Sequence, residues 1–152
     1  AASDVYKRQI LTPLQGKVLA QADIPDETFA QGILGPGCGI EPTGDTVYAP
    51  FDGTVTQIAT TLHAVGMTSS EGTELLIHVG MDTVDMKGQG FTALVKEGQK
   101  VTAGTPLLKV DLDAIRAAGH PTATAIIVTD GADDVKMLAE GDVVPGTPLF
   151  KV

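Results

Sequence analysis

EGQKVTAGTPLLKV (97–110) and EGDVVPGTPLFKV (140–152) are two copies of one motif, the second shorter by one residue. Each copy contains a glycine turn, a short strand-like run, a second glycine turn and a second strand-like run, which is typical of a β-hairpin. A shorter repeat precedes them, because the pattern P-x-x-G-x-V occurs in both PLQGKV (13–18) and PFDGTV (50–55). These repeats are too irregular for a solenoid, so they predict a duplicated hairpin unit within one all-β domain.

Strand-like runs continue outside the repeats, and clusters of turn-forming residues separate them. GPGCG (35–39) and TDGADD (129–134) are two such clusters, and both are predicted to be turns. The predicted strands are 16–20, 46–49, 54–58, 63–68, 74–80, 92–96, 107–110, 124–129 and 148–152.

Helical signal is restricted to two short segments. DLDAIRAAG (111–119) has an aspartate suited to an N-cap and a glycine suited to the helix end, and DVKMLAEG (134–141) is a weaker candidate. The sequence therefore predicts a compact antiparallel β-sandwich or barrel with duplicated hairpin repeats and one or two short helical turns. We expect residues 10–152 to form a single domain and residues 1–9 to be a disordered leader or linker.

The composition argues against several classes of function. The chain has 152 residues, of which 43% are hydrophobic, and this suffices for one domain with its own core. Its formal net charge of −9 argues against nucleic acid and anionic membranes as partners, because no basic patch would neutralise their phosphates. Cys38 is the only cysteine, so neither an internal disulfide nor a cysteine zinc site can form. No apolar run approaches the ~20 residues of a membrane span, and we expect a cytoplasmic protein without direct membrane insertion.

Two of the three histidines flank one predicted turn. TLHAVGMTS (61–69) and TELLIHVG (73–80) are both strand-like, and the serine and glycine residues between them favour a turn. A four-residue loop over 69–72 would place Thr68 opposite Thr73 in an antiparallel hairpin.

The same register places His63 directly opposite His78, and Thr61 opposite Gly80. Val65 would share their face of the hairpin. An odd loop length would instead put the two histidines on opposite faces. The residues assigned to the core face are Leu75, Ile77 and Val79.

Two facing imidazoles suit either metal binding or the transfer of a phosphoryl group. A catalytic zinc usually needs three protein ligands, and the sequence contains neither H-x-H nor H-E-x-x-H spacing. A phosphohistidine needs one nucleophilic ring nitrogen and donors for the phosphoryl oxygens, so we favour a phosphoryl carrier without cofactor or metal. Two alternatives stay open: a zinc-dependent hydrolase with His63 and His78 as ligands, and a biotinyl or lipoyl carrier that uses Lys87.

HAVGMTSSEGTELLIHVGMDTVDMKGQGF (63–91) carries a resemblance to a known family, supported by IPDETFAQGILGPGCGIEPTG (24–44) and YAPFDGTV (48–55). The sequence resembles the glucose-type IIA domain of the bacterial phosphoenolpyruvate–sugar phosphotransferase system over about residues 10 to 152. The resemblance implies an antiparallel β-sandwich that acts as a phosphotransferase component with a phosphohistidine intermediate.

The resemblance also implies roles for individual residues. His78 matches the histidine that carries the phosphoryl group, and His63 matches the second histidine, which stabilises the phosphorylated state. Thr61 matches a hydroxyl that is hydrogen-bonded within this pair. Gly80 and Asp82 match positions beside the site, and the Gly80 carbonyl would hold the ring tautomer.

The partners implied by the resemblance are proteins. The histidine-containing phosphocarrier protein would donate the phosphoryl group, and a sugar-specific IIB domain would accept it for coupled sugar uptake and phosphorylation. The chain would act in the cytoplasm, either free or tethered to the inner face of the membrane within a larger permease. The residues that match the apolar docking face are Phe29, Leu34, Leu76, Val79 and Val84.

Overall fold

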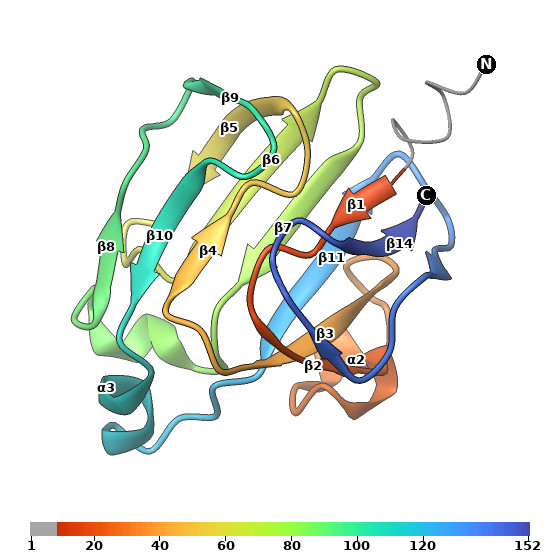
Figure 1. Cartoon of the computed structure of the whole chain (residues 1–152). Helices are drawn as coiled ribbons and strands as arrows, with labels where there is room; N and C mark the ends of the chain where they lie inside the picture. Colours follow the sequence, from red (N-terminus) through yellow and green to blue (C-terminus); the bar gives the residue numbers. More distant parts are fainter. Residues whose placement is uncertain (1–8) are drawn as a thin grey trace.

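The strands of the computed structural model, which describes residues 9–152, form three antiparallel sheets (Figure 1). The large sheet contains, in spatial order, β13 (Asp142–Val143), β2 (Gly16–Leu19), β3 (Gly37–Pro42), β11 (Thr124–Asp130), β7 (Glu74–His78), β6 (Ala64–Ser69), β5 (Gly53–Ile58) and β9 (Lys100–Val101). One small sheet contains β1 (Gln9–Leu11), β14 (Pro148–Lys151) and β12 (Lys136–Met137), and the other contains β4 (Thr46–Tyr48), β10 (Pro106–Val110) and β8 (Phe91–Ala93).

Helical segments in this part of the chain are short. They are η1 (Gln21–Asp23), α2 (Glu27–Ala30), η2 (Thr83–Met86) and α3 (Leu112–Ala117). No helix within residues 9–152 has the length and apolar character that crossing a bilayer requires.

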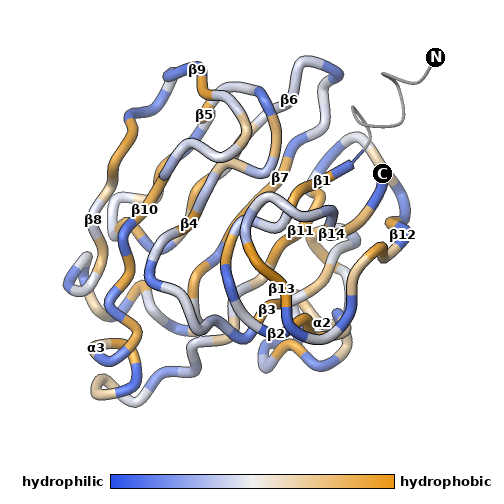
Figure 2. Tube along the Cα trace, in the orientation of Figure 1, coloured by the Kyte–Doolittle hydropathy of each residue, from blue (hydrophilic) through white to orange (hydrophobic). Residues whose placement is uncertain are grey.

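The main core lies between the large sheet and the two small sheets, which Figure 1 shows in front of it. Because side chains alternate along a strand, β11 sends Ile126 and Val128 into this core, and Ala125 and Ile127 to the opposite face. A second, smaller cluster covers that opposite face; it consists of Ile24, Phe29, Met81, Ala125 and Ile127, with Leu76 packed against it. In Figure 2 apolar residues follow the strands, whereas the tip between β6 and β7 is polar.

The repeated sequences form two equivalent units. In the first, Thr12 donates its backbone N–H to the carbonyl of Thr147 at 2.7 Å. In the second, Ala49 donates in the same way to Thr105 at 2.8 Å. The predicted antiparallel β fold with a duplicated unit is therefore confirmed. The two copies are not hairpins, because β9 and β13 lie in the large sheet whereas β10 and β14 lie in the small sheets.

The two units occupy opposite edges of the large sheet. Gly16 of β2 pairs with Val143 of the edge strand β13, and Gly53 of β5 pairs with Val101 of the other edge strand, β9. The strands β6, which His63 directly precedes, and β7, which ends at His78, lie between these edges.

The prediction of a turn at 35–39 is wrong, because Gly37–Pro42 is a strand of the large sheet that lies between β2 and β11. Glycine is required at Gly37 by close approach, since a Cβ atom there would lie 2.0 Å from the carbonyl oxygen of Ile126. The glycine-rich sequence therefore reflects tight strand packing, and only Gly35, before the strand, has a positive φ, of 137°.

One of the two predicted helical segments is confirmed. In α3, the carboxylate of Asp111 accepts a hydrogen bond from the Ala114 N–H at 3.1 Å, and Gly119 has a φ of 83°. The second prediction is wrong, because 134–141 contains the short strand β12, which pairs with β14. Gln9 also differs from expectation, since it begins β1; the rest of the expected leader lies outside the described residues. The single domain over 10–152 stays a prediction.

Candidate active site

His78 is the last residue of β7, and the alternation of that strand determines its direction. Leu75 and Ile77 are buried in the main core, so Leu76 and His78 face the second cluster. Nδ1 of His78 lies 2.9 Å from the carbonyl oxygen of Gly80. Because a carbonyl can only accept, Nδ1 carries the proton in this contact, and the lone pair of the neutral ring is on Nε2.

Gly80 is a position that no other residue can occupy without strain. Its φ is 72°, and a Cβ atom there would lie 2.5 Å from Cγ2 of Thr83 and 2.9 Å from the carbonyl oxygen of Pro121. The Thr83 hydroxyl donates a hydrogen bond of 2.6 Å to the carbonyl of Val79. This turn therefore fixes the direction of the carbonyl that holds His78.

The register of the histidine hairpin differs by one residue from the prediction. Ala64, and not His63, pairs with His78. The loop is longer than expected, because Ser69 donates its N–H to the Thr73 carbonyl at 2.9 Å and the strand pairing begins only beyond it. Val65 consequently lies in the main core and not on the face that carries His78.

The two imidazoles nevertheless meet, with ring centroids 4.8 Å apart and ring planes at 79°. His63 precedes the first residue of β6, so strand alternation does not determine where its side chain points. It follows Leu62, which has a φ of 62° in a turn closed by the Leu62 N–H and the Ala59 carbonyl. Nδ1 of His63 lies 2.8 Å from Oγ1 of Thr61, within the same turn.

Burial lowers the pKa of both histidines below the ordinary value of 6.5. For His63, which is 7% exposed, the charge of His78 lowers the pKa further, and a hydrogen bond to the Thr61 backbone acts in the opposite direction. For His78, the hydrogen bond to Gly80 and the charges of Asp26 and Asp82 partly offset the effect of burial on the pKa. The pair thus favours two neutral imidazoles.

Phe29 packs against the phosphoryl-carrier candidate His78. Their ring centroids lie 5.0 Å apart with planes tilted by 54°, and Phe29 is 6% exposed. The side chain comes from α2, whose N-cap Asp26 accepts a hydrogen bond from the Phe29 N–H at 3.2 Å. His78 is therefore bordered by an aromatic ring on one side and by His63 on another.

The other predicted site residues differ in exposure. Leu34 and Val84 are 41% and 51% exposed, and Leu76 is half-buried. Val79 is 0% exposed and packs in the main core, so its expected contact with a partner is wrong. Its strand position explains the difference, because alternation turns it away from the face of His78. Asp82 is exposed and has a φ of 60° beside the turn.

A sequence model of the family described as phosphoenolpyruvate-dependent sugar phosphotransferase system, EIIA 1, matches residues 8–134. The chain belongs to this family. The family, the β fold and the assignment as a phosphotransferase component, all expected from the sequence, are confirmed.

Known proteins similar to this EIIA chain include both separate and fused forms. The glucose-specific EIIA component of Halalkalibacterium halodurans is 43% identical over 129 residues, which cover 85% of this chain and 75% of that protein. The beta-glucoside-specific EIIBCA component of Bacillus subtilis is 47% identical over 124 residues, which cover 81% of this chain and 20% of that protein. This chain spans about a fifth of the length of the first curated relatives it matches.

A solved structure shares the fold of this EIIA chain. The glucose permease IIA from Mycoplasma capricolum superposes with a TM-score of 0.89 at 31% identity, and the match covers 93% of each chain.

The alternative functions find no support in this EIIA fold. Among residues 9–152, no three His, Cys, Asp or Glu side chains gather where they could hold a metal ion, and His63 and His78 have no third ligand. Lys87 ends the η2 segment and does not occupy a hairpin tip. Burial raises the pKa of the Cys38 thiol to about 12, so this cysteine is a poor nucleophile.

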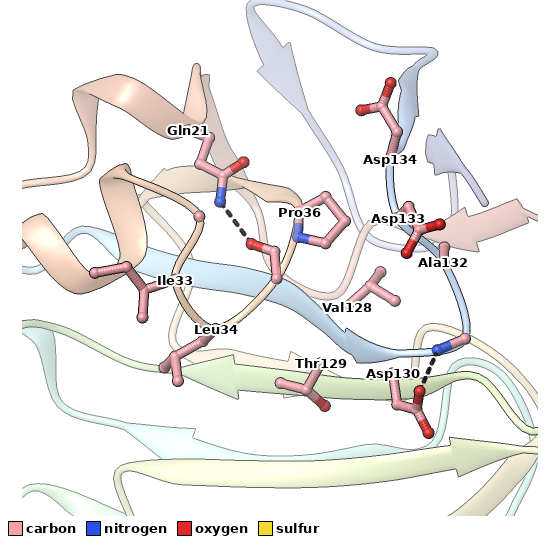
Figure 3. A pocket seen from close by; sticks show the side chains of 13 residues that line it. Gln21, Ile33, Leu34, Pro36, Val128, Thr129, Asp130, Ala132, Asp133 and Asp134 are labelled. Carbon is pink, nitrogen blue, oxygen red and sulfur yellow. Dashed lines mark hydrogen bonds between the residues drawn. The ribbon is translucent and has the colours of Figure 1, made fainter.

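Gln21, which no sequence motif indicates, contacts three backbone segments beside the site. Its amide contacts the backbone at Phe29, at Gly35 and at Gly37. A pocket of about 790 Å³ borders it, with Ile33 and Leu34 on one side (Figure 3). Asp130, Asp133 and Asp134 line the other side, and neither histidine lines it.

Proposed function

We propose that this EIIA chain accepts a phosphoryl group on Nε2 of His78 from the histidine-containing phosphocarrier protein and passes it to a sugar-specific IIB domain. The observation that supports this most directly is the hydrogen bond from Nδ1 of His78 to the Gly80 carbonyl, which leaves the lone pair on Nε2. The lowered pKa keeps that nitrogen unprotonated near neutral pH. A neutral imidazole held in one orientation is the nucleophile that phosphoryl transfer needs.

In the first half-reaction, the Nε2 lone pair of His78 forms a bond to phosphorus while the P–N bond of the donor histidine breaks. The ring of His78 then carries positive charge, which the Gly80 carbonyl stabilises through Nδ1–H. In the second half-reaction, the thiolate of a IIB cysteine attacks phosphorus, and the His78–phosphorus bond breaks.

His63 supports the phosphorylated state in this proposal. A phosphoryl dianion beside His63 favours its protonated form, because an opposite charge raises the pKa of an imidazole. Protonated His63 donates from Nδ1 toward Thr61 and from Nε2 toward a phosphoryl oxygen. Asp82, in the turn beyond Gly80, is proposed as a supporting residue.

The docking face of the proposal consists of Phe29, Leu34, Leu76 and Val84, of which Phe29 and Leu76 belong to the second cluster and Phe29 contacts His78. The exposed apolar side chains Leu34 and Val84 would exclude water from the reacting phosphorus when a partner covers them. The relatives that join EIIB, EIIC and EIIA in one chain support a IIB domain as the acceptor. We place the reaction in the cytoplasm, with the chain either free or tethered to a permease.

Phosphosite mapping after incubation with phosphoenolpyruvate, enzyme I and the phosphocarrier protein tests the proposal. We expect one acid-labile phosphoryl group on His78, and no label on His78→Ala with the fold retained. His120→Gln is the matched control, because His120 is a half-buried histidine that lies in a loop and outside the hairpin of β6 and β7. Label on His63 or on a serine would overturn the assignment.

The role of His63 is tested by measuring the two half-reactions of His63→Gln separately. Glutamine keeps one donor but cannot become positively charged. Acceptance from the phosphocarrier protein should survive, whereas transfer to a IIB domain should fall about 10²-fold, which is roughly 2.7 kcal/mol. Equal onward rates in variant and wild type would show that His63 is only a neighbour.

A further inference from the structure

The position of Phe29 depends on contacts from outside its own helix. α2 has four residues, which is one helical turn, and a helix of this length is not stable by itself. The N-cap bond from the Phe29 N–H to Asp26 stabilises this single turn but does not connect it to another element. Other contacts must therefore determine where Phe29 lies against His78.

Gln21 supplies such contacts. Its Nε2 donates to the Phe29 carbonyl at 3.0 Å and to the Gly35 carbonyl at 2.8 Å, and its Oε1 accepts from the Gly37 N–H at 3.3 Å. Figure 3 shows the amide directed at the backbone before Pro36. Both amide N–H groups and the amide oxygen are thus used within the protein.

These bonds connect the one-turn helix α2 to the large sheet. Gly37 is the first residue of β3, which pairs with β2 on one side and β11 on the other. Through Gln21, the carbonyl of Phe29 is tied to a central strand of the large sheet. The same amide holds the Gly35 carbonyl in the segment that links α2 to β3.

The His78 ring needs this support because one hydrogen bond does not fix it. Rotation about the Cβ–Cγ bond of histidine has a broad energy profile, so Nδ1 bound to Gly80 can tilt unless neighbours pack on the ring. Phe29 at 5.0 Å and His63 at 4.8 Å are the aromatic neighbours. Only Phe29 comes from an element whose position depends on Gln21.

We propose that Gln21 is a positioning residue for phosphoryl transfer: it holds Phe29 against His78 and thereby keeps Nε2 of His78 in the direction of attack. The kinetic part of this inference rests on the function proposed above. The structural part concerns only the orientation and water access of the imidazole, which can be measured without a phosphoryl donor.

Gln21→Met tests the inference, because methionine has a similar length but no hydrogen-bonding amide. NMR titration of the ring nitrogens should show the His78 pKa rising toward its ordinary value as water reaches the ring, with a mixture of tautomers. The charged or titratable groups that act on His78, namely His63, Asp26 and Asp82, are the same in both proteins. With the phosphocarrier protein as donor, kcat should fall about ten-fold.

Gln99→Met is the matched control. Gln99 is exposed, and its Oε1 accepts a hydrogen bond from the Lys96 N–H at 3.1 Å in the turn before β9. It should leave the His78 pKa and kcat unchanged. Should Gln21→Met not fold, Gln21→Glu serves instead, because it keeps the acceptor for Gly37 but cannot donate to Phe29 or Gly35. Its readouts are kcat and the tautomers of His78, because the added carboxylate by itself raises the His78 pKa.

A double-mutant cycle with Phe29→Leu shows whether Gln21 acts through Phe29. Residues that act through one contact have non-additive effects, so the double variant should be no worse than the more impaired single variant. Additive effects, or a raised KM with unchanged kcat and unchanged His78 pKa, would overturn the inference. Wild-type protein that gains no phosphoryl group on His78 would overturn the proposed function, whereas the NMR result would still decide the role of Gln21.

Discussion

At the scale of single residues, the chemistry of the site depends on which nitrogen of each imidazole carries a proton. The Gly80 carbonyl settles this for His78, because it can only accept from Nδ1. Oγ1 of Thr61 lies 2.8 Å from Nδ1 of His63. In both rings, therefore, Nδ1 is within hydrogen-bonding distance of an oxygen atom of the chain. Nε2 is then the nitrogen of each ring that remains for a phosphoryl group.

The lowered pKa values of His63 and His78 also predict how stability depends on pH. Both histidines titrate near 6.5 in the unfolded chain but lower in the folded protein, so the unfolded state binds more protons as the pH falls. The free energy of unfolding should therefore be constant above this region and decrease as the pH drops below about 6.5. Urea denaturation at about pH 7.5 and about pH 5.5, where most carboxylates stay ionised, measures the loss.

The double variant His63→Gln/His78→Gln provides the comparison. Without the two imidazoles, the decrease between these pH values should become smaller. The same decrease in wild type and double variant would show that other groups cause it, and an increase in stability toward low pH would contradict the direction of both pKa shifts.

The sequence identified the two histidines as neighbours, although the register used to place them was wrong. Strand alternation explained the direction of His78 but could not apply to His63, which precedes β6. The deciding feature is the positive φ of Leu62, a conformation that leucine rarely adopts and that its sequence does not signal. Gln21 was missed for a related reason, because its three backbone contacts depend on how separate loops approach each other.

At the scale of elements, α2 determines the surroundings of His78 through both its cap and its charge. Asp26 accepts a hydrogen bond from the Phe29 N–H, and its negative charge raises the pKa of His78. These two effects can be separated. Asp26→Asn keeps a capping side chain but removes the charge, so it should lower the His78 pKa at nearly unchanged stability, whereas Asp26→Ala should also cost about 1 kcal/mol of stability.

The N-cap of α3 is a matched control for this prediction. Asp111 caps Ala114 in the same manner, so Asp111→Ala should cost a similar amount of stability while the His78 pKa stays unchanged. NMR titration and urea denaturation measure the two quantities. If Asp26→Asn raised the His78 pKa, the charge argument would fail; if Asp26→Ala were as stable as Asp26→Asn, the capping argument would fail.

Elements with a repeated sequence pattern or a helix cap could be predicted from the sequence. Elements that depend on close contact between distant backbone segments could not. The capped helix α3 and the short strands of the repeats carry local signals, so the sequence located them, but the division of each repeat between two sheets carries no local signal. β3 contains Gly37 and Gly39, which local rules assign to a turn, but the glycines allow β3 to lie between two strands. The segment 134–141 has helix-forming residues, yet pairing with β14 determines its structure.

At the scale of the whole molecule, the duplication stabilises the site although neither copy contributes a histidine. The two units form the edges of the large sheet and contribute strands to both small sheets, and the histidine hairpin lies between them. Side chains of both units, including Leu14, Val55, Leu107 and Leu149, share the main core. We therefore expect the two units to unfold together in one cooperative transition.

Equivalent glycines in the two units test this expectation. A Cβ atom at Gly16 would lie 2.1 Å from the Glu41 carbonyl oxygen, and one at Gly53 would lie 2.3 Å from the Thr68 carbonyl oxygen. Backbone atoms cannot move aside without separating the strands, so Gly16→Ala and Gly53→Ala should each lower the free energy of unfolding by about 3–5 kcal/mol.

Gly104→Ala and Gly146→Ala are the matched controls. Each glycine has a φ of 88° and no heavy atom within 4 Å of an added Cβ, so each substitution should lower the free energy of unfolding by only about 1–2 kcal/mol through left-handed strain. Urea denaturation followed by circular dichroism and by tyrosine fluorescence should give coincident, single transitions for all four variants. A two-step transition in Gly16→Ala would show instead that one unit unfolds while the other, with the hairpin of His63 and His78, stays folded.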